Sequence, residues 1–195
     1  MMRRLAIAAL LVLAGPAAAD VGLPRGWNFS GISWQDYEFG TDSVAGASSK
    51  AAYIKARPEI RTDGFGGMIQ CIKAENYLGK RLRFSARMRS VAASSGQLWM
   101  RVDGPRTEQG GAAPVTLGFY NMGDNPIRGN TDWKRYDVVL DAPDNSVTIC
   151  YGFFLAGGKG EVWADNLNLE AVGKDVPVSR SMVMPKGPVN LGFDR

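Results

Sequence analysis

The chain has 195 residues, 45% of them hydrophobic and 22% charged, which is enough for one domain with a sizeable core. Histidine is absent, which excludes a Ser-His-Asp or Cys-His nucleophilic site and any His-ligated zinc or copper centre. The formal net charge of +4 is only a small basic excess. The sequence contains no pattern typical of a recognition helix, a zinc finger or an aromatic RNA-binding strand. We therefore expect no nucleic-acid partner.

Residues 1–19 have the pattern of a secretory signal peptide. Two arginines precede an apolar run, Leu5 to Ala14, and an A-x-A cleavage site follows at residues 17–19. The run is too short to span a bilayer, and no cysteine follows it, so we expect no lipoprotein anchor. Loss of this segment lowers the net charge to +2. We expect a periplasmic or secreted protein with no transmembrane segment in the mature chain.

Period-two alternation between turn residues predicts an all-β protein. Along Lys80 to Ser90, apolar side chains at the even positions face one way, and four arginines at odd positions face the other. Gln97 to Asp103 repeats this alternation. Further strands are expected at Ala51–Ala56, Gly67–Ala74, Val115–Asn121, Lys134–Asp141, Val147–Leu155 and Glu161–Glu170. Short strands at such spacing predict an antiparallel two-sheet β-sandwich, a jelly roll.

Three further segments complete the expected organisation. Ala74 to Leu78 predicts a short helical turn, and Gly104 to Pro114 predicts a polar surface loop. After a jelly-roll domain over residues 20–173, residues 174–195 are expected to form an extended C-terminal tail. The tail ends in the strand-like sequence NLGFD, which could dock as an edge strand on this domain or on a neighbour. Alternatively, that sequence is the vestige of a second repeat.

The chain resembles a galactose-binding-like or carbohydrate-binding-like β-jelly-roll module of bacteria. The resemblance rests on the segments GKRLRFSARMRS, LWMRVDGP, NMGDNPIRGNTDWKRYDVVLDAP and GFFLAGGKGEVWADNLNLEAVGKDVPVS. They lie between Phe65 and Ser179. Such modules occur alone or attached to regulators and peptidase-like proteins. The resemblance implies an extracytoplasmic binding domain, and its motifs identify the module without identifying a ligand.

The resemblance also makes Asp165 a candidate ligand of a structural calcium ion. In related jelly rolls, an Asp on the final strand often helps to hold this ion. Calcium takes about six to eight oxygen ligands, so other carboxylates would have to contribute, such as Asp36, Glu38, Asp42 or Asp194. The alternative is that Asp165 only hydrogen-bonds the adjoining loop. No other cofactor is expected.

The two cysteines, Cys71 and Cys150, are too few for a Cys-only metal site. In an oxidising compartment they could form a single disulfide. Both lie in apolar strand-like runs, so two buried free thiols are the alternative. The choice depends on the distance and direction between the two Cβ atoms, which the sequence does not supply.

The polar face of the two clearest strands is the candidate ligand site. If these strands pair, Arg87 lies near Trp99 and Arg101 on an open sheet surface, and Tyr120 and Asn121 lie at a turn beside it. Aromatic rings stack on the C–H faces of sugars, and guanidinium groups bind hydroxyls or carboxylates, so this mixture suits a carbohydrate or a similar polar ligand. The alternative is a solvated face held together by cross-strand ion pairs.

We predict an exported, non-catalytic binding module for a carbohydrate or similar polar ligand. One alternative is an envelope module that binds a protein partner or has a structural role, and another is a carboxylate-dependent glycan-active enzyme. The enzyme has little support, because Glu161, Asp165 and Glu170 do not follow the E-x-D-x-x-E spacing of jelly-roll glycanases. Trp163 alternates with Asp165 and Leu167 and is therefore expected in the core.

Overall fold

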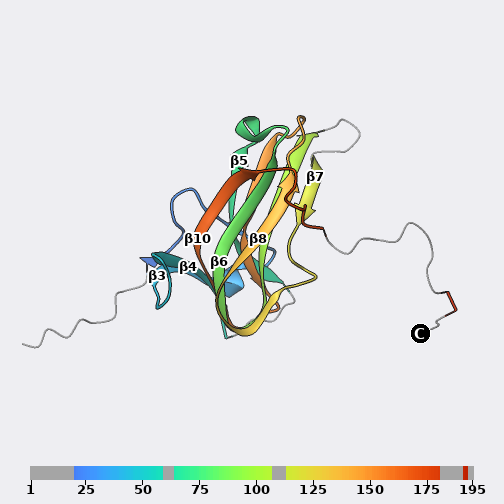
Figure 1. Cartoon of the computed structure of the whole chain (residues 1–195). Helices are drawn as coiled ribbons and strands as arrows, with labels where there is room; N and C mark the ends of the chain where they lie inside the picture. The colour runs from blue at the N-terminus through green and yellow to red at the C-terminus, as the bar shows by residue number, and fades with distance from the viewer. Residues whose placement is uncertain (1–19, 59–63, 107–112, 181–190, 193–195) are drawn as a thin grey trace, which may run out of the picture.

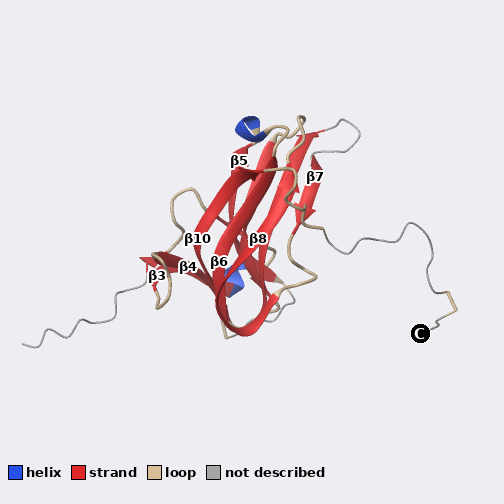
Figure 2. Ribbon diagram, in the orientation of Figure 1, coloured by secondary structure: helices blue, strands red, loops and turns tan. Residues whose placement is uncertain are grey.

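The computed structural model describes residues 20–58, 64–106, 113–180 and 191–192, which form antiparallel strands and two short 3-10 helices (Figures 1 and 2). This confirms the all-β prediction. No helix in this part of the chain is long and apolar enough to cross a membrane. The helices are η1 (Trp34–Asp36) and η2 (Glu75–Tyr77). The strands are β1 (Asp20–Val21), β2 (Asn28–Ser30), β3 (Tyr37–Ser43), β4 (Lys50–Ala56), β5 (Phe65–Lys73), β6 (Arg81–Arg106), β7 (Pro114–Tyr120), β8 (Ile127–Asp141), β9 (Thr148–Ala156) and β10 (Glu161–Val172).

Strand β6 joins the two layers of the sandwich. Residues 81–91 pair with β10, and residues 95–103 pair with β9. Between these halves the chain turns at Ala92, which has a φ of 48° and whose N–H donates a hydrogen bond to Oδ1 of Asn130. The first sheet therefore has the order β1-β3-β4-β10-β6-β8, and the second sheet has the order β2-β5-β9-β6-β7. In Figure 1, β10, β6 and β8 lie side by side.

The length of β6 corrects one prediction. The strands expected at Lys80 to Ser90 and at Gln97 to Asp103 are the two halves of a single 26-residue strand. Because they belong to one strand, they do not pair with each other, and each half lies in a different sheet. The polar residues of the first half therefore do not lie beside Trp99 in the way that the sequence suggested.

The core fills the space between the two sheets. The inward residues expected on β6 are confirmed, because Leu82, Phe84, Ala86 and Met88 are buried in one half and Leu98, Met100 and Val102 in the other. Every second residue of β9 from Ile149 to Leu155 belongs to the same core cluster and completes this layer. Burial of each large apolar side chain contributes about 1.5–3 kcal/mol, so this alternation on β6 and β9 supplies much of the driving force for folding.

Trp163 does not lie in the core, so that prediction was wrong. The buried residues of β10 at this point are its neighbours Val162 and Ala164. Trp163 lies on the outer face of the first sheet, where its ring is 4.9 Å from that of Tyr53 on β4, with the ring planes tilted by 45°.

A β-bulge explains the error. The register of β10 against β6 shifts between Asp165 and Asn168, and Asn166 within the bulge has a φ of 49°. One extra residue reverses the faces of all later residues in a strand, so Leu167 and Leu169 pack against the core. The inward face of these two leucines therefore does not continue across the bulge to Trp163, which points outward.

The first part of the C-terminal tail lies against the first sheet. The N–H of Ser179 donates to the carbonyl of Val139 on β8 at 2.8 Å, and the N–H of Val139 donates to the Ser179 hydroxyl at 3.0 Å. Arg81 donates to the carbonyls of Lys174 and Val176. This segment follows β10 in dark red in Figure 1. The expected docking of NLGFD falls largely outside the described residues.

Candidate functional site

The arginines at the start of β6 form cross-strand ion pairs. Arg81 binds Asp141 of β8 through two hydrogen bonds of 2.9 and 3.0 Å, and Arg83 binds Glu170 of β10 at 2.8 Å. Hydrogen bonds from Arg81 and Lys174 lower the pKa of Asp141 to about 2. For these arginines the structure therefore has the ion-paired arrangement that was the alternative to a ligand site.

Arg87 is held under the β3–β4 loop, residues 44–49. One guanidinium nitrogen lies 3.6 Å from Asp165 of β10, and another donates to the carbonyl of Gly46 at 3.1 Å. The guanidinium also lies 5.4 Å from the centre of the Trp133 ring. Arg87 thus belongs to the first sheet, whereas Trp99 belongs to the second, and the structure does not bring these two predicted site residues together.

Asp165 fastens the same loop. It is 1% exposed, and its Oδ2 accepts hydrogen bonds from the N–H and the hydroxyl of Ser48 at 2.6 and 3.0 Å. Its Oδ1 is buried without a hydrogen-bond partner. Among the described residues, no group of three or more His, Cys, Asp or Glu side chains is placed to hold a metal ion, and Asp194 lies outside them. The observed contacts of Asp165 are those of a loop anchor.

A groove crosses the outer face of the second sheet. In one row across the strands, Ile69 of β5, Gly152 of β9 and Trp99 of β6 lie opposite one another. A Cβ atom at Gly152 would lie 1.9 Å from the carbonyl oxygen of Met68, so only glycine fits there. The floor between Ile69 and Trp99 therefore carries no side chain.

Aromatic rings border this hollow, whose volume is about 460 Å³. On one side, Trp99 and Phe119 of β7 have ring centres 6.5 Å apart, and Phe119 is 50% exposed. On the other side, the rings of Phe65 and Phe154 are 5.1 Å apart. We call this hollow the Trp99 groove, lined by Phe65, Ile69, Gln97, Trp99, Arg101 and Phe119, with Phe154 and Asn121 beside them.

Arg101 provides the charge in the Trp99 groove. Its Nε donates to Oδ2 of Asp103 at 2.9 Å, and Asp103 is almost fully buried and also accepts a hydrogen bond from Thr116. The Arg101 side chain remains 41% exposed. The guanidinium is therefore held by Asp103 and is still partly exposed.

Gln97 provides a second polar group in the Trp99 groove. Its Nε2 donates to the hydroxyl of Ser95 at 2.8 Å, whereas its Oε1 is buried without a partner. Asn121 is half-buried at the edge, and its Oδ1 accepts a hydrogen bond from the N–H of Gly123 at 3.1 Å.

The structure brings together three of the five predicted ligand-binding residues, namely Trp99, Arg101 and Asn121. Tyr120 packs partly against the core, and its hydroxyl donates to Asp124 at 2.7 Å. Burial and this hydrogen bond raise the pKa of Tyr120 to about 12. The sequence reasoning missed the groove residues of β5, β7 and β9, because these strands lie next to β6 only in the folded sheet, and it also missed Gln97 of β6 itself. The sequence feature that could have indicated them is that each occupies an outward position in its own strand.

Cys71 and Cys150 face each other across β5 and β9 and are joined in a disulfide. Of the two alternatives drawn from the sequence, the structure thus has the bridge. Cys150 also lies opposite Arg101 of β6, so the disulfide is two residues along the strands from Gly152 at the floor of the Trp99 groove.

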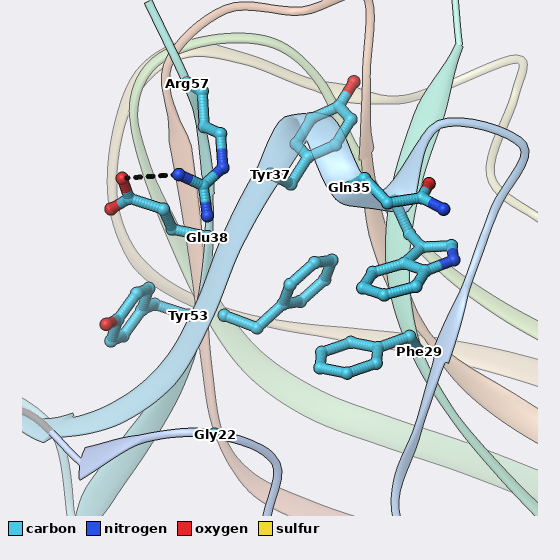
Figure 3. A pocket seen from close by; sticks show the side chains of 9 residues that line it. Gly22, Phe29, Gln35, Tyr37, Glu38, Tyr53 and Arg57 are labelled. Atoms are coloured by element: carbon cyan, nitrogen blue, oxygen red, sulfur yellow. Dashed lines mark ion pairs between the residues drawn. The ribbon is translucent and has the colours of Figure 1, made fainter.

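A second hollow, also of about 460 Å³, lies beside β3 and β4 (Figure 3). In this end pocket, Phe29 stacks on Trp34 with ring centres 4.5 Å apart, and Glu38 pairs with Arg57 at 3.8 Å. The pKa of Tyr53 at the other side is raised by burial and by the negative charge of Glu38. Because its rings stack on each other and its charges pair, the end pocket is less suited to a ligand than the Trp99 groove.

No family model matches the chain. It is 39% identical over 176 residues to the uncharacterized HTH-type transcriptional regulator YbfP of Bacillus subtilis (strain 168). The match covers 87% of this chain and 57% of that protein, so the chain spans little more than half the length of this relative.

Several solved structures are similar in fold. The C-terminal family 22 carbohydrate binding module of Clostridium thermocellum Xyn10B is 13% identical with a TM-score of 0.50, over 82% of this chain and 94% of that chain. The CBM22-1-GH10 modules of the same enzyme, solved with xylohexaose, are 12% identical with a TM-score of 0.50, and the match covers 76% of this chain and 26% of that chain. The enzymatically active domain of bacteriophage CBA120 tailspike protein 4 is 13% identical with a TM-score of 0.51, and the match covers 76% of this chain and 20% of that chain. These similarities identify the fold as the β-sandwich found in carbohydrate-binding modules.

Proposed function

We propose that the protein is an exported, non-catalytic module that binds a carbohydrate or a similar polar ligand in the Trp99 groove. The observation that carries the proposal is the groove itself, in which aromatic rings surround an open glycine floor beside Arg101 and Gln97. Ligand sites commonly combine apolar walls with a few fixed polar groups in this way. The shared β-sandwich of the family 22 module from Clostridium thermocellum adds support.

Binding in the Trp99 groove would use two kinds of contact. The rings of Trp99 and Phe119 offer flat apolar surfaces to the C–H faces of a sugar. Arg101 and Gln97 lie two residues to either side of Trp99 on the same face of β6, so they reach the ring substituents of a sugar stacked on it. Because these residues sit on paired strands, little ordering entropy is lost when the ligand binds.

The character of the groove lining favours binding over hydrolysis. Glycoside hydrolysis commonly uses two carboxyl groups that flank the scissile bond. Among the described residues that line the Trp99 groove there is no Asp or Glu, and the nearby Asp103 is paired with Arg101 and has its side chain only 3% exposed.

Export is the part of the proposal that rests on residues 1–19, whose sequence has the three regions of a signal peptide. Expression of the full chain in a Gram-negative host, followed by cell fractionation and mass spectrometry, tests it. We expect a mature protein that begins at Asp20 outside the cytoplasm. A full-length protein retained in the cytoplasm would refute export without bearing on the Trp99 groove.

A glycan panel followed by isothermal titration calorimetry tests the binding function. Loss of a central aromatic contact typically costs about 2 kcal/mol or more, so Trp99→Ala should weaken binding by roughly 30-fold or more. Trp163→Ala is the matched control, because Trp163 lies on the outer face of the other sheet, and it should bind as the native protein does. Absence of binding across the panel, or unchanged binding by the Trp99 variant, would refute the proposal.

A further inference from the structure

We propose that the Trp99 groove selects acidic glycans, whose carboxylate or sulfate group binds Arg101. This inference rests on the proposed carbohydrate-binding function and specifies the ligand class. Arg101 and Trp99 are two residues apart on one face of β6, a spacing of about 7 Å. A sugar ring stacked on Trp99 therefore brings a substituent, or the next ring of the chain, over the guanidinium of Arg101.

Arg101 differs from Arg81 and Arg83 in how its counter-ion is exposed, and unlike Arg87, which also pairs with a buried carboxylate, it is not held by the β3–β4 loop. Arg81 and Arg83 pair with the carboxylates of Asp141 and Glu170, whose side chains are 41% and 37% exposed. A ligand approaching either pair meets both charges. The side chain of Asp103, which pairs with Arg101, is only 3% exposed. A ligand in the groove therefore meets the positive member of this pair alone.

The geometry of Arg101 also prepares it for an anion. Asp103 binds Nε at 2.9 Å and is itself held by the hydroxyl of Thr116. This contact fixes the plane of the guanidinium before a ligand arrives. Guanidinium groups bind carboxylates and sulfate-like oxyanions through paired, charge-assisted hydrogen bonds, which are stronger than those to neutral hydroxyls.

Among the described residues, the lining of the groove carries no negative charge that would repel an anion. Of the groove-lining residues that the structure describes, Arg101 is the charged one, and the others are apolar or carry amide or hydroxyl groups.

The test compares matched ligands by calorimetry at low salt, using the full mature chain. Acidic oligosaccharides, such as oligogalacturonates and sulfated galactans, are paired with their carboxyl-reduced and desulfated forms. We expect at least one acidic ligand to bind roughly tenfold more tightly than its neutral form, as one charge-assisted contact provides. This preference should shrink as salt increases. The two ligand series separate carboxylate from sulfate recognition.

Arg101→Gln should remove the preference by weakening the acidic ligand to the level of the neutral one. Arg101→Lys should keep part of it, which separates charge recognition from loss of packing. Arg83→Gln is the matched control on the other sheet and should leave the preference unchanged. Equal binding of acidic and neutral forms would overturn the inference while leaving the proposed function intact. Absence of binding in both series would overturn both.

Discussion

Removal of the Cys71–Cys150 disulfide should destabilise the protein without abolishing its fold. The bridge joins residues 79 positions apart. Closing a loop of that size lowers the conformational entropy of the unfolded chain, which destabilises the unfolded state by about 4.5 kcal/mol. The native strands β5 and β9 are paired along nine residues on their own, so the folded state should keep its sheet. We expect the free energy of unfolding to fall by about 2–4 kcal/mol, and Tm by about 10 °C.

Urea unfolding, followed by tryptophan fluorescence, measures this effect in the oxidised protein and in the protein reduced with dithiothreitol. The double variant Cys71→Ser, Cys150→Ser is the control, because it should match the reduced protein and should not respond to the reductant. If reduction changes the free energy of unfolding by less than about 1 kcal/mol, the loop-entropy argument is refuted for this chain.

Three further predictions concern the first sheet. Because hydrogen bonds from Arg81 lower the pKa of Asp141 from 3.8 to about 2, its stabilising effect should be complete above about pH 4 and disappear as the pH falls toward 2. In Asp141→Asn this part of the acid-dependent loss of Tm should be missing, and an unchanged acid profile would contradict the assignment. Asp165→Ala should cost about 2–3 kcal/mol in urea unfolding, since it leaves Arg87 without its buried partner. The Ser48 and Arg87 contacts predict the same Tm in calcium and in chelator, and a rise with calcium would instead identify Asp165 as a ligand.

The sequence was sufficient to identify most strands and the core face of β6. Strict alternation of Leu82, Phe84 and Met88 with arginines is a local signal, and these three apolar side chains are all buried, although Ser85 on the other face is buried as well. The strands β1 to β3 were harder to detect. β1 and β2 are only two and three residues long, and the pattern of β3 is interrupted by Gly40 and Thr41.

The position of the site depended on information that a local pattern does not contain. The corner at Ala92 sends the two halves of β6 into different sheets, which separates Arg87 from Trp99. The bulge after Asp165 likewise reversed the predicted face of Trp163. Both features depend on single residues with positive φ. These residues are Ala92 and Asn166, and because neither is a glycine, the sequence did not indicate a turn or a bulge at these positions.

The passage of β6 through both sheets has a consequence for how this scaffold can change. In its second half, the residues that hold the sandwich together are Leu98, Met100 and Val102, whereas Gln97, Trp99 and Arg101 point the other way. Under the proposed function, substitutions at these three outward positions would alter what the groove recognises and would leave the interior packing in place. New specificities can therefore arise, or be engineered, by exchanging every second residue of one strand.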